Sequence, residues 1–133
     1  MLENANISSP LVEQYQAEAK FLRAFYHFEL FKHFGPIPVV TKLLTPDDNG
    51  LQRDNMTAVF TAIVSDLEAA IALLPVTVSS SEVGRANKAV ASALLGKVYL
   101  YWADLDDDNA EKFQLAAQHL QQVVDFGIYQ LED

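Results

Sequence analysis

Apolar residues recur every three or four positions in four separate stretches of the chain, and each stretch ends at residues that stop a helix. This spacing predicts amphipathic helices. The expected helices run over about Pro10–Phe34, Asn55–Leu74, Asn87–Ala103 and Ala110–Phe126. No strand signal remains between them. The sequence therefore predicts an all-α fold of about four helices in two antiparallel pairs.

The expected helix ends carry capping residues. Ser9 can cap the first helix, and Pro10 suits its first turn, where a backbone N–H would have no partner. Asn87 is a good cap for the third helix. Gly35 and Gly127 stand where the first and fourth helices should close through a left-handed residue.

The first helix carries two apolar rows on different sides. One row consists of Phe21, Phe25 and Phe28, and the other of Leu22, Tyr26 and Leu30. A helix that is apolar on two sides is expected to pack on two sides. The loop that follows, Pro36–Arg53, should hold Ile37, Val39 and Val40 in an extended and partly buried form.

The second and fourth helices share one internal spacing. Ile63, Leu67, Ala70 and Pro75 align with Ala116, Leu120, Val123 and Ile128. This spacing resembles the second helix of a tetratricopeptide repeat. The third helix supplies the preceding half of such a repeat with Leu95, Gly96 and Tyr99, and the first helix offers Leu22 and Tyr26 at those places, with Arg23 in the glycine position.

In such repeats a large side chain of one helix fills the space left by small residues of its partner, and each pair leaves a face for the next pair. The loops inside the pairs are long for the consensus. An ordinary bundle of two helical hairpins is the alternative.

Length, net charge and the absence of cysteine exclude several classes of function. The length suits a single domain, 1–133, and the formal charge of −9 argues against binding nucleic acid or an anionic lipid surface. The chain has no cysteine, which excludes disulfides, thiolate metal sites and a cysteine nucleophile. No run of about 18 uninterrupted apolar residues occurs, and the polar N-terminus shows no signal peptide.

Four ordered blocks resemble one protein family. They are Ala17–Leu30 with Phe34–Val40 (AEAKFLRAFYHFEL and FGPIPVV), Ile63–Pro75 (IVSDLEAAIALLP), Gly84–Tyr101 (GRANKAVASALLGKVYLY) and Ala116–Leu131 (AAQHLQQVVDFGIYQL). The first block resembles the AEAxxLRA helix and GxxP[LV] loop of SusD/RagB nutrient-binding lipoproteins. In the third, Asn87 replaces the usual capping threonine and Ala89 a glycine.

This resemblance implies a helical scaffold in a surface lipoprotein of the outer membrane. Members of the family capture oligosaccharides or polysaccharides without enzymatic chemistry and work with a SusC-like TonB-dependent transporter. They are several times longer, and their lipid-bearing cysteine is absent from these residues. Their ligand contacts come largely from other parts of the chain, so the resemblance assigns no glycan site here. A tetratricopeptide-type adaptor for protein segments is the alternative function.

Candidate chemistry beyond the resemblance is sparse. Asp104, Asp106 and Asp108 alternate like calcium ligands, but Asn109 replaces the turn glycine and Leu115 the bidentate glutamate, so a solvated loop is the better interpretation. The three histidines have no metal-ligand spacing, and no nucleophile elbow or phosphate loop occurs. We therefore expect no enzyme activity, no metal and no cofactor.

Two arginines are expected to have structural roles. Arg23 lies in an otherwise aromatic helix and should pair with Asp66 or Glu18, because a buried guanidinium needs partners. Arg85 should anchor its loop to carbonyl groups at a helix end.

Aromatic residues remain as candidate glycan contacts, since sugars stack on aromatic faces. Trp102, beside the acidic loop, is the first candidate and Tyr129 the second, although an aromatic residue at helical spacing is more often core. If the apolar helix faces lack cover in this chain, self-association is expected as well.

Overall fold

The computed structural model describes residues 9–107 and 109–129. Within them the chain forms four α-helices: α1 (Ser9–Phe34), α2 (Met56–Leu73), α3 (Lys88–Leu105) and α4 (Ala110–Asp125). Two short 3-10 helices, η2 (Pro46–Asp48) and η3 (Ser80–Glu82), lie in the loops and were not predicted. The described residues contain no strand, so the all-α prediction is confirmed.

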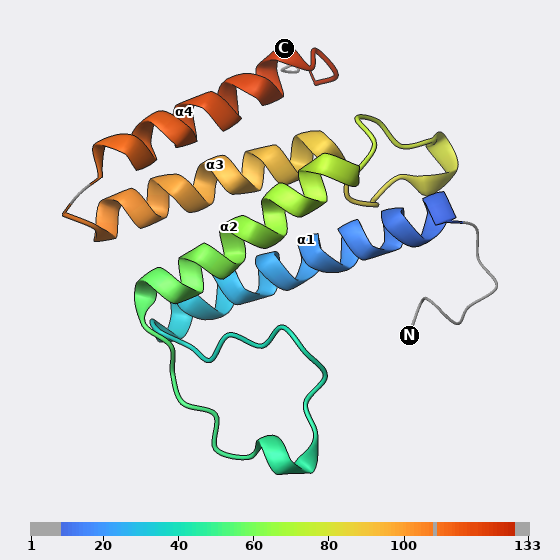
Figure 1. Ribbon diagram of the computed structural model, residues 1–133. Coiled ribbons are helices and arrows are strands. Elements are labelled where there is room, and N and C mark those ends of the chain that lie inside the picture. Colours follow the sequence, from blue (N-terminus) through green and yellow to red (C-terminus); the bar gives the residue numbers. More distant parts are fainter. Residues whose placement is uncertain (1–8, 108, 130–133) are drawn as a thin grey trace.

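Each helix packs antiparallel against the next one along the chain (Figure 1). The helices α1 and α2 form one hairpin and α3 and α4 the second, with α2 against α3 joining them. The predicted pair of antiparallel pairs is therefore confirmed. The loop between α1 and α2 extends away from the helices at one end of the layer.

Local capping explains where the helices start and stop. The side chains of Asn55 and Asn87 accept hydrogen bonds from the N–H groups of Ala58 and Val90, at 2.8 and 2.9 Å, and so satisfy first-turn donors. Gly35 closes α1 at a φ of 67°, a conformation that favours glycine. Helix α1 begins at Ser9, one residue earlier than predicted.

The core runs between α1, α2 and α3. Its fully buried large side chains include Phe28, Phe60, Ile63, Leu67 and Leu95. After α1 the chain turns back, so that Ile37 is buried while Val39 and Val40 are partly buried, as predicted.

One predicted feature of α1 is wrong. Its first row is buried or partly buried, but Leu22, Tyr26 and Leu30 are 49, 60 and 45% exposed. Leu95 and Tyr99 hold the equivalent repeat positions in α3. These two side chains are buried because α3 packs between α2 and α4. Among the described residues, helix α1 packs closely against α2 on one side, and its second apolar row is exposed.

Helix α2 is the most apolar of the four. Of the helices in the described ranges, it alone is long and apolar enough by length and composition to cross a membrane. The central helix of a globular bundle passes the same test, and α2 packs on both α1 and α3. Its buried Asp66 is hydrogen-bonded to Arg23.

Candidate functional site

Tyr129 lines a cavity of about 320 Å³ between the start of α3, the loop before it and α1. The cavity wall is formed by Phe21, Val78, Val83, Gly84, Arg85, Ala86, Asn87, Val90 and Tyr129. The Asn87 side-chain amide donates to the Tyr129 hydroxyl at 3.0 Å, which fixes the phenol beside the cap of α3. The Tyr129 side chain remains 57% exposed, so its ring is open to a ligand.

Arg85 forms part of the cavity wall, and the carboxylate of Glu18 on α1 holds it in place. Its Nε and Nη2 atoms donate to both carboxylate oxygens of Glu18, at 2.9 and 2.8 Å. This paired hydrogen bond raises the pKa of the Arg85 guanidinium. The guanidinium also lies 5.2 Å from the ring centre of Tyr15. Arg85 thus joins the loop before α3 to the side of α1, and the prediction that it binds helix-end carbonyls is wrong.

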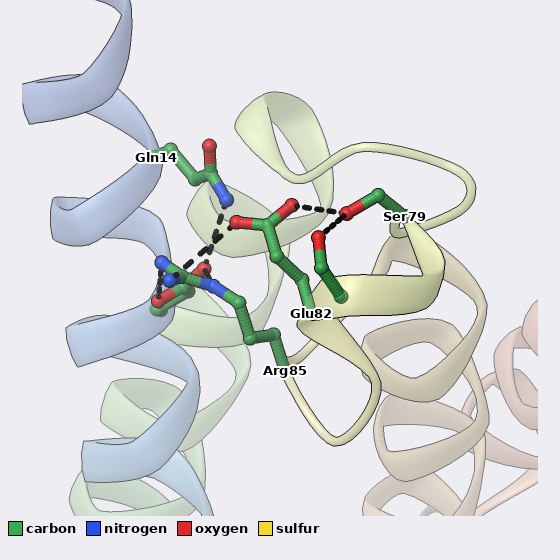
Figure 2. A network of polar contacts seen from close by, with 6 residues as sticks. Gln14, Ser79, Glu82 and Arg85 are labelled. Carbon is green, nitrogen blue, oxygen red and sulfur yellow. Dashed lines mark hydrogen bonds and ion pairs between the residues drawn. The ribbon is translucent and has the colours of Figure 1, made fainter.

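Neighbouring polar groups extend this contact, as Figure 2 shows. Gln14 donates to Glu18 at 3.1 Å, and Glu82 lies 3.7 Å from Arg85. Glu82 in turn accepts from the Ser79 hydroxyl. The Ser-rich turn η3 is therefore tied to the same guanidinium that lines the cavity, which gives this loop a defined shape.

Trp102 lies in a different environment. Its ring stacks on Phe60 of α2 and on Tyr99, with centres 5.2 and 6.4 Å apart, and Lys112 of α4 sits 5.0 Å from its centre. Tyr99 stacks in turn on His119 of α4. The indole N–H is buried without a hydrogen-bond partner. This four-ring stack across three helices was not predicted, because Phe60 and His119 are distant in sequence from Tyr99 and Trp102.

The structure does not bring the two predicted glycan contacts together. Trp102 lies in the last turn of α3, whereas Tyr129 is bonded to Asn87 at the start of the same helix. A separation of 15 residues along a helix is about 22 Å. The two residues would therefore belong to separate contacts, and a glycan role for either one stays a prediction.

A second polar cluster anchors the loop between α1 and α2. Arg23 donates to both carboxylate oxygens of Asp66, each at 2.6 Å, and to the carbonyl of Thr41 at 3.0 Å. The predicted Arg23–Asp66 pair is confirmed. The hydrogen bonds that Arg23 donates to Asp66 raise the pKa of the Arg23 guanidinium despite its partial burial.

His27 of α1 binds the same loop. Its Nε2 atom accepts from the Val40 N–H at 3.3 Å. Burial, and then the nearby charge of Arg23, lower the pKa of His27, which favours the neutral form that can accept this bond.

The acidic loop after α3 does not present a metal site among the described residues. Asp106 pairs with Lys112 at 3.0 Å. No group of three or more His, Asp or Glu side chains suited to a metal occurs in 9–107 and 109–129, and Asp108 lies outside the described residues.

A hollow along α2, lined by residues such as Thr57, Thr61 and Ser65, has no charged side chain in its wall.

Comparison with known proteins identifies the family. Residues 1–100 match the model of a SusD-like family described as starch-binding and associating with the outer membrane. The chain belongs to the SusD-like family. No curated protein matches it in sequence.

Solved SusD-like structures share the four-helix arrangement. A SusD-like protein from Bacteroides fragilis is 29% identical with a TM-score of 0.87, and covers 99% of this chain and 24% of its own. A laminarin-binding SusD-like protein is 34% identical with a TM-score of 0.86, over 98% of this chain and 28% of its own. A SusD-like carbohydrate-binding protein from B. fragilis is 27% identical with a TM-score of 0.80, over 91% and 23%. This chain thus spans about a quarter of the length of these SusD-like relatives.

Proposed function

We propose that this SusD-like chain is the helical scaffold of a non-enzymatic glycan-binding protein at the cell surface. The protein captures oligosaccharide or polysaccharide by equilibrium binding and presents it to a SusC-like TonB-dependent transporter of the outer membrane. Its attachment there as a lipoprotein is part of the proposal. The observation that carries it is the match of residues 1–100 to a family model described as starch-binding.

The similarity to a laminarin-binding relative adds the ligand class. That protein is 34% identical over 98% of this chain, which supports a glycan as the class of ligand. The side chains described above also suit a scaffold. Arg23 and Arg85 are each held by a carboxylate of another element and so fix loops to helices rather than reaching for a substrate.

Tyr129 is the glycan contact that we favour. Its exposed ring forms part of a cavity wall, and its hydroxyl is already oriented by Asn87. A ring held in this way loses little freedom when a sugar stacks on it. Trp102 remains a second candidate, but most of its ring area packs on other rings.

Affinity gel electrophoresis tests the proposal. The chain is run in native gels that contain laminarin, starch or another polysaccharide, and its mobility is compared with a gel without glycan. We expect retardation by at least one β-glucan or α-glucan, and mobility that recovers when soluble oligosaccharide of the same glycan competes. A hydrolysis assay on the same glycans is expected to release no reducing sugar.

Mobility that is unchanged in every gel would contradict glycan binding by these helices. Retention of a peptide or protein partner by the same chain would then favour the tetratricopeptide-type adaptor instead.

A further inference from the structure

The cavity beside Tyr129 combines apolar walls with few polar groups. Its volume of about 320 Å³ lies at the lower end of the range for small-molecule sites, about 300–1,000 Å³, so it suits a short piece of a ligand. Val83, Val90 and Tyr129 in its wall are 81, 41 and 57% exposed. These side chains offer apolar surface to the C–H faces of a sugar ring.

The Tyr129 hydroxyl is the polar group that the cavity presents beside this surface. Because Asn87 donates to the Tyr129 oxygen at 3.0 Å, the Tyr129 O–H can itself donate to a ligand. A phenol can donate to the hydroxyl of a neutral sugar or to the carboxylate of an acidic one. A second feature must therefore separate these two classes of sugar.

The charges around Arg85 provide that feature. Among the described residues, Arg85 is the only charged side chain in the cavity wall. Glu18 holds the guanidinium through two hydrogen bonds of 2.9 and 2.8 Å, and Glu82 lies 3.7 Å from it (Figure 2). One positive and two negative charges leave a net charge of −1 beside the cavity.

The second carboxylate is more than Arg85 needs as an anchor. Glu18 already binds the guanidinium at two atoms, and the Tyr15 ring centre lies 5.2 Å from it. Glu82 is held in turn by the Ser79 hydroxyl at 3.1 Å. Its charge changes a neutral Arg85–Glu18 pair into a negative cluster, so the guanidinium cannot attract an anion as an unpaired arginine does.

We propose that Glu18 and Glu82 set the specificity of this cavity for uncharged sugars. A hydroxyl group of a neutral sugar meets no repulsion there, whereas the carboxylate of a uronic acid meets two like charges. This inference rests on the proposed glycan function, and it adds to that function the residues that reject acidic glycans.

A matched pair of ligands tests the proposal. The neutral ligand is an oligosaccharide of laminarin or starch, and the acidic ligand is its C6-oxidised form, in which glucuronic acid replaces glucose. Isothermal titration calorimetry measures both affinities, at low salt and at about 150 mM salt. We expect the parent chain to bind the oxidised form at least roughly tenfold more weakly than the neutral one, with a smaller difference at the higher salt concentration.

Two variants and one control assign this selectivity to named residues. Glu18→Gln and Glu82→Gln each remove one negative charge beside Arg85 and should improve binding of the oxidised form, relative to the neutral form, by roughly three- to tenfold. Glu111→Gln changes the net charge of the chain equally. It lies exposed in the first turn of α4, at the opposite end of that helix from Tyr129, and should leave the ratio unchanged.

Glu82→Gln also guards against a loss of loop structure. In this variant Arg85 keeps both of its hydrogen bonds to Glu18, so the variant stays informative even if Glu18→Gln loosens the loop before α3. Circular dichroism and urea unfolding compare the folded state of each variant with that of the parent chain.

The outcomes separate the specificity from the proposed function. If the parent chain binds the oxidised form as tightly as the neutral one, the proposal is overturned while glycan binding stands. An unchanged ratio in both cavity variants, or an equal change in Glu111→Gln, would overturn it as well, because net charge alone would then explain the selectivity. Binding of neither ligand would contradict the proposed glycan function, and the specificity proposal would fall with it.

Discussion

Leu120 of α4 lies directly over Gly96 of α3. A Cβ atom at position 96 would stand 2.7 Å from the Leu120 Cγ and 3.2 Å from the Ala116 carbonyl oxygen, both too close for ordinary contact. Gly96 and Ala116 are fully or nearly fully buried, so neither helix can shift without opening the contact between them. The missing side chain of one helix thus makes room for the large side chain of the other.

Replacing Gly96 by alanine should therefore destabilise the chain. Alanine gains about 1 kcal/mol of helix propensity over glycine, but the clash costs more, about 1–3 kcal/mol for an overpacked site. We expect a net loss of up to about 2 kcal/mol in urea unfolding.

A double-mutant cycle with Leu120→Ala isolates the contact. Because Leu120→Ala leaves a space that the new methyl group can use, the double variant should be more stable than the sum of the two single losses allows. Strictly additive losses would show that Leu120 does not limit the space at position 96.

The Gly96–Leu120 contact shows what the sequence could predict. Gly96 and Leu120 each stand at a position that matches the tetratricopeptide-repeat spacing. Such repeats place a small residue of one helix opposite a large residue of its partner. The helix ends at Asn55, Asn87 and Gly127 were equally accessible, since capping depends on the residue itself and its immediate neighbours.

Breaking the Arg23–Asp66 pair should loosen the loop between α1 and α2 as well as the helix contact. Asp66→Asn removes the charge from a side chain that is only 10% exposed and leaves one acceptor oxygen in place of two for the Arg23 guanidinium. We expect a loss of about 2 kcal/mol in unfolding free energy, below the value for a fully buried pair because Arg23 is 33% exposed.

Two variants sharpen this prediction. Arg23→Lys keeps the charge but cannot form the paired hydrogen bonds, so it should recover only part of the stability. Lys42→Ala removes a pair with Asp48 in which the lysine is 69% exposed, and it should hardly move the melting temperature. Equal effects of Asp66→Asn and Lys42→Ala would contradict a special role for the buried pair.

Other parts of the site were not accessible from the sequence. The second apolar row of α1 was predicted to be packed, but its side chains are exposed. The apolar pattern shows which side chains a helix can bury, and it does not show which neighbouring element covers them. Arg85 was expected to bind backbone, whereas its partner Glu18 lies 67 positions earlier. Such pairs depend on how the hairpins pack, which local spacing does not encode.

Stability should fall as the solution becomes acidic. Burial lowers the pKa of both His27 and His119 in the folded chain, while the unfolded chain keeps the ordinary value of about 6.5. The unfolded state therefore binds more protons below that pH, so the stability present at neutral pH is lost as the pH falls through the window below about 6.5. Lowered pKa values of Glu29 and Asp48 act only at more acidic pH.

Urea unfolding at pH 7.5, 6.5 and 5.5 measures this dependence. His27→Gln should flatten it, because a glutamine can still accept from the Val40 N–H but does not titrate. The same slope in the parent chain, in His27→Gln and in His119→Gln would contradict the assignment to these two histidines.

The last prediction separates the two candidate glycan contacts. If the Tyr129 ring stacks on sugar, Tyr129→Ala should weaken retention in a glycan gel roughly tenfold, about 1.4 kcal/mol, whereas Tyr129→Phe keeps the ring and should retain most of it. Trp102→Phe leaves a smaller ring between Phe60 and Tyr99, so we expect lower stability and little change in retention. Weaker retention by Trp102→Phe at unchanged unfolding free energy would instead add Trp102 to the site. Retention that is equal for Tyr129→Ala and the parent chain would remove Tyr129 from it.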